Sequence, residues 1–366
     1  MTETRKQCPV CGSDLSKQLG AELNACPRCR FPYAQVTQFA DSSSLISWKQ
    51  LVQNYRADLI QKLQNKCREE RVFLLAGGSV VCKLMEERIL ALVRPDSLHI
   101  QTDPMVVQYS AAENASRNEA YLLANGTVRS MGDNSYSQCN TSNMTGIKRL
   151  LATPACTYGI TKNGGVVVSG QRMFPAVENW KNIRDLTAGT YHLAGLTTDG
   201  RVLVTGNMLN PDVVREMKSW RDVTSVVAAG DATLALRKDG SVVFAGKAGN
   251  PRRAGVRQWT QITDIALESV YAVGLTSAGK VLLAGENRNE DLDMGRKDAA
   301  NWTDIIAISC SRSGIGALGI DGTLHLVGNL REIEQIENTW EKIRTRFMDQ
   351  LIRSVVDATS ELSTLI

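Results

Sequence analysis

Four cysteines near the start of the chain have the residue type and spacing of a metal site. Cys8 and Cys11 are separated by two residues, Cys26 and Cys29 repeat that spacing, and fourteen residues lie between the pairs. Each Cys-x-x-Cys turn directs two sulfurs toward one ion, and a connecting hairpin brings the second pair around to complete a tetrahedron. Because all four ligands are thiolates, no coordination position is left for a substrate. The sequence therefore predicts one structural Zn²⁺ that holds the fold.

Redox-active Cys-x-x-Cys motifs are the alternative interpretation, but no thioredoxin-like strand-helix-strand pattern surrounds these pairs. The segment resembles the zinc ribbons found at the ends of many prokaryotic proteins, over about the first thirty-five residues. Ribbons bind both proteins and nucleic acids. We interpret Lys6, Arg28 and Arg30 as cations that offset the charge of four thiolates, with nucleic-acid contact as the alternative.

Other residues that could do chemistry do not form a catalytic pattern. The sequence has three histidines, His99, His192 and His325, and the last two fall on repeat positions, where structural roles are expected. It contains no HExxH, GxSxG or GxxxxGK[ST] string. The segment Gly314 to Gly319 spells GxGxxG but runs into a hairpin turn, whereas a phosphate-binding loop opens a helix. We therefore expect no enzymatic activity and no small-molecule substrate.

The chain repeats with a period of about forty residues, which is the strongest signal for its fold. Four tryptophans each stand twenty residues before a turn glycine, and six residues later comes a second glycine. The tryptophans are Trp180, Trp220, Trp259 and Trp302; the turn glycines are Gly200, Gly240, Gly279 and Gly322; the second glycines are Gly206, Gly246, Gly285 and Gly328.

Weaker copies extend the repeat toward the start of the chain. Two centre on Gly126 and Gly164, with Met144 at the tryptophan position of the latter, and a degenerate copy covers Val72 to Asp103. Apolar runs flank each turn glycine, which predicts small antiparallel sheets of three or four strands that must stack to bury their faces. A ring closes the exposed ends, so we predict a mainly β fold, a propeller of six to seven blades. A linear β-solenoid is the alternative, although its rungs are usually shorter.

The repeats resemble those of the regulator of chromosome condensation family, over about 270 residues. The match lies in TAGTYHLAGLTTDG around His192 and in MGDNSYSQCN from Met131 to Asn140, which is similar to the family's blade junction. It is closest to the short-blade bacterial type, which includes a propeller-type β-lactamase inhibitor protein. The resemblance implies a propeller fold and, as alternatives for function, enzyme inhibition or nucleotide exchange. The Gly-Gln-Leu-Gly junction is mostly missing, which argues against guanine nucleotide exchange.

Two helices should flank the propeller. The first follows a polar cap at Asp41 to Ser44, and the second runs from Trp340, where the repeat restarts in a way that also suggests a closing terminal strand. Their apolar positions recur at helical spacing: Leu51, Val52, Tyr55, Leu59 and Leu63 in the first, and Ile343, Phe347, Leu351 and Val355 in the second. We expect both to pack on the propeller edge, with partner docking or oligomerisation as the alternative. The predicted organisation is zinc ribbon 1–40, linker and helix 41–70, propeller 71–340 and C-terminal helix 341–366.

Composition and loops complete the functional expectation. The formal charge of +4 is too weak to indicate a nucleic-acid surface by itself, and the absence of a signal peptide or a long apolar run predicts a cytoplasmic protein that does not contact membranes. Two charged loops, 247–258 and 286–298, are candidate partner contacts. Their cationic residues are Arg252, Arg253, Arg257, Arg288, Arg296 and Lys297. The leading hypothesis is a protein-protein interaction module, and the alternative is nucleic-acid binding through the ribbon and the basic loops.

Overall fold

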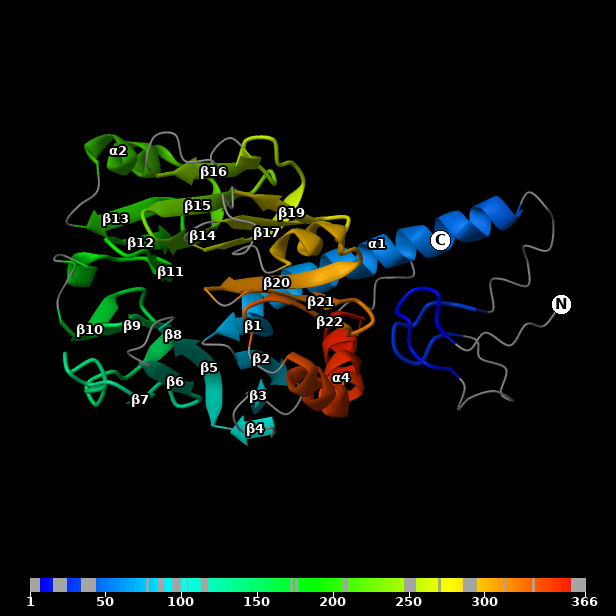
Figure 1. The fold of residues 1–366 in the computed structure, drawn as a ribbon, viewed down its shortest axis with the longest axis horizontal. Coiled ribbons are helices and arrows are strands. Elements are labelled where there is room, and N and C mark those ends of the chain that lie inside the picture. Colours follow the sequence, from blue (N-terminus) through cyan, green and yellow to red (C-terminus); the bar gives the residue numbers. More distant parts are fainter. Residues whose placement is uncertain are drawn as a thin grey trace.

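The structure is a computed structural model of the chain, shown as a ribbon in Figure 1. The residues that it describes are 7–15, 25–33, 44–76, 79–84, 89–93, 100–103, 105–112, 118–171, 174, 177–206, 210–246, 255–268, 271–285, 295–312, 314–330 and 333–356.

Seven antiparallel sheets follow one another along the described chain, so the propeller prediction is confirmed with seven blades. The degenerate copy at Val72 to Asp103 is blade 1, and it has four strands where the other blades have three. Blade 1 contains β1 (Phe73–Ala76), β2 (Ser79–Leu84), β3 (Ile89–Val93) and β4 (Ile100–Asp103); blade 2, β5 (Val106–Ala111), β6 (Glu119–Leu123) and β7 (Val128–Met131); blade 3, β8 (Ile147–Ala152), β9 (Cys156–Thr161) and β10 (Val166–Gly170); blade 4, β11 (Ile183–Ala188), β12 (His192–Thr197) and β13 (Val202–Gly206). Blade 5 contains β14 (Val223–Ala229), β15 (Ala232–Arg237) and β16 (Val242–Ala245); blade 6, β17 (Ile262–Leu267), β18 (Ala272–Thr276) and β19 (Val281–Ala284); blade 7, β20 (Ile305–Ser311), β21 (Gly314–Gly319) and β22 (Leu324–Gly328).

The recurring turn glycine joins each blade to the next. Gly200 has φ +76°, and its carbonyl accepts a hydrogen bond of 3.0 Å from the amide of Val223, the first residue of the following blade. A Cβ on Gly200 would lie 3.2 Å from the Val223 backbone, so both the backbone conformation and the close approach favour glycine. The same bond links Gly126, Gly164, Gly240 and Gly279 to Ile147, Ile183, Ile262 and Ile305.

The recurring tryptophans form part of the core between blades. Trp220 and Trp259 are buried, and Met144 takes the equivalent buried position in the repeat that forms blade 3. The Trp180 ring packs so closely on β12 that a Cβ added to Gly195 would lie 2.7 Å from the Trp180 Cζ3 atom. The tryptophan of each strong repeat therefore fills the space behind a sheet that cannot bury both faces alone.

The ring is not closed by a terminal strand, so that expectation was wrong. The chain is helical around Trp340, in α4 (Ile333–Val356), and blade 1 already has four strands from the N-terminal side. The repeat position is nevertheless used, because the Trp340 indole Nε1 donates a 2.9 Å hydrogen bond to the Gly322 carbonyl. The side chain thus replaces the backbone amide that bonds the turn glycine in earlier blades.

The predicted first helix is α1 (Ser44–Glu70), and it inserts into the ring instead of lying on its edge. Figure 1 shows α1 running toward the middle of the propeller, with α4 beside β22. The α1 residues Leu59 and Leu63 belong to one buried cluster with Phe31 of the cysteine segment, Phe73 of blade 1 and Trp340 of α4. The other helices that lie wholly within the described residues are short: α2 (Pro211–Ser219), η3 (Val177–Asn179) and η5 (Arg296–Asn301). None of the described helices has the length and apolar character that a membrane span requires.

Candidate functional site

The four-cysteine segment folds into two matching turns. The Cys8 carbonyl accepts the Gly12 amide at 2.9 Å, and the Cys26 carbonyl accepts the Arg30 amide at the same distance. Gly12 and Arg30 both have a left-handed φ, of 68° and 60°. Glycine adopts this conformation freely, whereas arginine does so at a cost that the surrounding turn must offset.

The four sulfurs converge as a metal site requires. The Sγ atoms of Cys8 and Cys29 are 3.7 Å apart, as are those of Cys11 and Cys26, and all four lie within 4.8 Å of one another. A tetrahedron with Zn–S bonds of about 2.3 Å has edges of about 3.8 Å. Interaction with Cys11 lowers the pKa of Cys8 to about 6, while interaction with Cys11 raises the pKa of Cys29. A bound divalent cation would stabilise all four as thiolates.

Hydrogen bonds and ion pairs join the cysteine cluster to α1 and α4. Arg56 of α1 donates to the Val10 carbonyl at 2.7 Å and forms a 2.9 Å ion pair with Asp304 of blade 7. Arg28 forms a 2.6 Å ion pair with Asp349 of α4. Of the three cations considered for a nucleic-acid contact, Arg28 is therefore engaged within the protein, Arg30 is exposed, and Lys6 lies outside the described residues. The cluster is continuous with the core of the propeller.

The first strands of the blades surround a central channel of about 1040 Å³. The last turn of α1 and Arg71 lie at one end of the channel, which we call the inner end. The hairpins that join the first and second strands of each blade lie at the other end. We call this second end the hairpin end; it includes Pro154, Gly189 and the exposed Thr190.

A repeated β-bulge gives the inner end its polar character. In blades 2 to 7 the register between the first and second strands shifts near the start of the first strand, as between Ile183 and Asp185. Bulges re-aim side chains and increase local twist. The residues that follow the shift are Gln108, Arg149, Asp185, Ser225, Asp264 and Ala307, and all but Ala307 line the channel.

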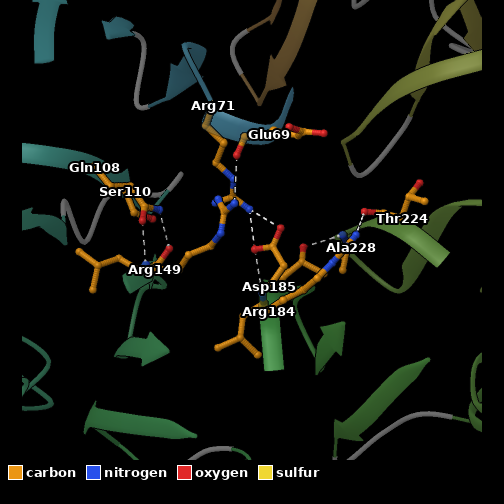
Figure 2. Close-up of polar contacts among 12 residues, drawn as sticks. Glu69, Arg71, Gln108, Ser110, Arg149, Arg184, Asp185, Thr224 and Ala228 are labelled. Carbon is orange, nitrogen blue, oxygen red and sulfur yellow. Dashed lines mark hydrogen bonds and ion pairs between the residues drawn. The ribbon is translucent and has the colours of Figure 1, made fainter. Parts of the chain in front are cut away.

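Charged side chains meet at this inner end (Figure 2). Nη2 of Arg71 donates to both carboxylate oxygens of Asp185, at 2.5 and 2.6 Å. Nη2 of Arg149 donates to the Glu69 carbonyl at the end of α1, at 3.1 Å, and Arg184 donates to a backbone carbonyl of β14. Burial lowers the pKa of Arg149, and the nearby Arg71 lowers it further. Burial also raises the pKa of Asp264 to about 6.

Side chains cap the free edges of several first strands. Gln108 exchanges two 3.0 Å hydrogen bonds with the Leu150 backbone, and the Thr187 hydroxyl accepts the Ala228 amide at 2.8 Å. Ser309 accepts the Leu75 amide at 2.9 Å where blade 7 meets blade 1. Backbone groups that a ligand strand would need are thus already bonded at these positions.

The hairpin end carries exposed apolar side chains. Tyr191 lies in the β11–β12 hairpin and is 48% exposed, and Met131 at the end of β7 is 47% exposed. Tyr136 is 50% exposed in the junction after β7, where Gln138 accepts the Tyr136 amide and donates to the Pro154 carbonyl of the next hairpin. The family-like junction therefore fixes a tyrosine beside the hairpin end.

The candidate residues of the charged loops are only partly described. Arg252, Arg253 and Arg288 lie outside the described residues. Arg257 and Lys297 are exposed in consecutive blade connections. Arg296 lies 5.4 Å above the Tyr271 ring and donates to the Arg312 carbonyl, so part of its role is to pack blade 6 against blade 7.

The two described histidines, His192 and His325, have structural surroundings, and His99 lies outside the described residues. Nε2 of the buried His192 is 2.6 Å from the Thr233 hydroxyl, and burial lowers the His192 pKa to about 4. His325 stacks near Trp302, with ring centroids 5.2 Å apart. The GxGxxG string forms β21, a buried strand.

The arginines and the aspartate of the inner end were missed by sequence reasoning. One signal could have indicated them: Arg149, Asp185 and Asp264 each stand two residues after a repeat isoleucine, in strands that are otherwise mostly apolar. Arg71 has no such signal, because it belongs to no repeat position.

Comparison with known proteins adds solved structures of low similarity. No family model and no curated protein matches the chain. The yeast RCC1 protein Prp20, bound to Kap60, is 15% identical, with 63% of this chain and 73% of that chain covered and a TM-score of 0.47. The ectodomain of the Physcomitrella patens receptor kinase CR4 is 14% identical, with 60% and 63% covered and a TM-score of 0.49. YCF48 bound to D1 peptide is 12% identical, with 70% and 91% covered and a TM-score of 0.41. At these values the likeness carries no functional argument, and the propeller fold rests on the seven sheets of this chain.

Proposed function

We propose that this protein is a protein-protein interaction module whose propeller binds a protein partner at the hairpin end. The observation that carries the proposal is the exposure of Met131, Tyr136 and Tyr191, all at this end of blades 2 to 4. Tyrosine and methionine are enriched at protein interfaces, where tyrosine supplies apolar area together with a polar tip. The seven-sheet ring holds these side chains on a rigid frame.

The four-cysteine cluster completes the proposal as a structural Zn²⁺ site. Cys8, Cys11, Cys26 and Cys29 fit the ion in number, ligand type and sulfur spacing. Since the thiolates fill all four positions, the ion stabilises the fold and takes no part in a reaction. Metal analysis of the purified protein is expected to give one zinc per chain, and Cys11→Ser is expected to lose it.

We propose that the module does not catalyse a reaction. Nε2 of His192 lies 2.6 Å from the Thr233 hydroxyl, but both side chains are fully buried, so a substrate cannot reach this pair. The exposed Arg257 and Lys297 add positive charge to the connections of blades 5 to 7, which suits a partner with acidic residues.

Affinity purification with matched variants tests the proposal. Tagged wild type, the double variant Tyr136→Ser/Tyr191→Ser and the control Met105→Ser are recovered from native lysate with nuclease at moderate salt, and bound proteins are identified by mass spectrometry. Met105 is also exposed, at 51%, but precedes β5 at the opposite end of the blade. A stoichiometric protein is expected with wild type and control and not with the double variant. Retention by the double variant, or recovery only of nucleic acid that nuclease removes, contradicts the proposal.

A further inference from the structure

The inner end of the channel has more positive than negative charge. Arg71, Arg149 and Arg184 meet there around the carboxylate of Asp185, and the exposed Glu69 also lines the channel at this end. The end of α1 adds the partial negative charge of a helix C-terminus, roughly half a unit. Nearby, Arg68 and Asp264 oppose each other. The three arginines therefore outweigh Asp185, Glu69 and the helix end together by roughly half a positive charge, in a place where burial weakens solvent screening.

Two of these arginines retain hydrogen-bond donors. Within the described part of the chain, the hydrogen bonds of Arg71 and of Arg149 each use only Nη2. A guanidinium carries five N–H groups in a fork that matches the two oxygens of a carboxylate or phosphate. The geometry thus leaves two neighbouring guanidinium groups able to bind one further oxyanion.

Above this charged end, the channel wall includes apolar side chains, with Ser110, Thr187 and, nearer the hairpin end, Glu268 among its polar residues. Leu74, Ala111, Leu151, Ala188 and Val227 are partly buried side chains from the first strands of blades 1 to 5, and all of them line the channel. The volume of about 1040 Å³ is at the upper end of the range typical of small-molecule sites. Since side chains already cap strand edges near the inner end, a ligand is recognised there by the arginines and the wall and not by strand addition.

From this arrangement we infer that the channel is a binding site for an oxyanion, a carboxylate or phosphate, on an apolar stem that enters through the hairpin end. Arg71 and Arg149 bind the anionic group, Arg184 adds to the local positive potential, and the apolar side chains of the wall contact the stem. The ligand is either a free amphiphilic acid or the C-terminal end of a peptide with apolar side chains, which share this chemistry. The inference concerns the channel and does not depend on the tyrosine surface of the proposed function.

Calorimetric titration of the full-length, zinc-loaded protein tests the inference. The free-acid probes are octanoate and octyl phosphate. Octanol is the uncharged compound of the same chain length, which we call their neutral twin. The peptide probe is a leucine- and alanine-rich octapeptide with a free C-terminal carboxylate, and its twin is the C-terminal amide. At least one anionic probe is expected to bind about tenfold or more tightly than its twin, and to weaken as salt is added. Binding only by the acids identifies a small-molecule ligand, and binding only by the peptide identifies a polypeptide end.

Variants distinguish the arginine site from general charge attraction. Arg149→Gln is expected to weaken anionic binding about tenfold, and Arg149→Lys to lie between it and wild type, because lysine keeps the charge and loses the fork. The control Arg201→Gln changes net charge equally at an arginine whose side chain is 60% exposed beside Asp199; its binding should match wild type. Equal affinity of charged and neutral twins, no binding by any probe, or unchanged binding by Arg149→Gln overturns the inference. If circular dichroism shows that Arg149→Gln is unfolded, competition by inorganic pyrophosphate against the wild-type complex replaces it, and lack of competition overturns the inference.

Discussion

A hydrogen bond to the carbonyl of the turn glycine recurs from blade to blade, and its donor is a backbone amide in every case but one. In the repeats with a turn glycine, the glycine carbonyl accepts a backbone amide from the next blade, as Gly200 does from Val223. Gly322 has no following blade in sequence, and its carbonyl accepts the Trp340 indole instead. Trp340 is fully buried, so the bond is shielded from water and its loss would leave an unsatisfied carbonyl.

Replacing Trp340 with phenylalanine should therefore destabilise the fold beyond the loss of apolar area. We expect a cost of about 1–3 kcal/mol for the unpaired carbonyl, with further loss from the smaller ring. Urea unfolding followed by circular dichroism measures it. Trp180→Phe is the control, because the Gly164 carbonyl is bonded by the Ile183 amide and not by an indole. Equal costs for the two variants would contradict the role assigned to the Trp340 bond.

His192 should make stability depend on pH. Burial lowers its pKa from 6.5 to about 4, so the unfolded chain binds a proton that the native protein does not bind between these values. The stability contribution of neutral His192 is therefore full above pH 6.5 and is lost as pH falls toward 4. We expect the free energy of unfolding to fall less between pH 7.5 and 5 in His192→Gln than in wild type. Taking this difference cancels effects common to both proteins, such as metal release, and equal falls would exclude the role.

At the scale of elements, α1 acts as a plug that closes the inner end of the channel, because its polar side chains form hydrogen bonds with backbone groups of the blades. Gln64 is 2% exposed, and its Nε2 donates at 3.0 Å to both the Thr276 and Ile305 carbonyls, while its Oε1 accepts the Thr263 hydroxyl. Arg68, one turn later, donates to the Thr263 carbonyl at 2.6 Å. The helix thus satisfies backbone groups at the inner end of blades 6 and 7.

Gln64→Leu should remove these bonds while keeping a similar volume. The buried Ile305 carbonyl would lose its side-chain donor, while the Thr276 carbonyl would keep the Gly279 amide. The expected cost is about 1–3 kcal/mol, measured as a shift of the urea midpoint at constant slope. Gln61→Leu is the matched control on the same helix, because Gln61 is exposed and should change stability by less than about 0.5 kcal/mol. A midpoint for Gln64→Leu that equals the control would argue against the plug.

Considered as a whole molecule, the cysteine cluster and the propeller share one buried core. Phe31, which follows Cys29, packs edge-on against Tyr55 of α1 at 5.2 Å, and the same core contains Leu63 and Trp340. Loss of the ion would therefore loosen the region where blade 7 meets blade 1, not only the N-terminal turns.

Metal removal should lower the stability of the entire chain. We expect chelation to lower the melting temperature of wild type by ~5 °C or more, because a shift of this size corresponds to a loss of a few kcal/mol. Cys8→Ser should show the low value without chelator, whereas Cys139→Ser, outside the cluster, should behave as wild type. Melting followed by tryptophan fluorescence measures the effect. A propeller transition insensitive to chelation would show that the cluster is an independent unit.

The sequence by itself determined the features that depend on local spacing. The tryptophan-to-glycine interval predicted the blades, the paired Cys-x-x-Cys turns predicted the cluster, and helical spacing predicted α1 and α4, because each pattern reports neighbours within one repeat or one turn. It could not choose between six and seven blades, since the blade 1 copy has lost the tryptophan and the turn glycine.

Only the tertiary structure determined which residues from distant parts of the sequence contact one another across the ring. Arg71 and Asp185 are 114 residues apart, and they form an ion pair because closure brings the end of α1 against a bulge in β11. The restart at Trp340 was compatible with a strand, but blade 1 was already complete, so the segment became a helix that keeps only the indole bond. Local patterns carry no information about such contacts, because their stability comes from burial and charge pairing that exist only once the ring has closed.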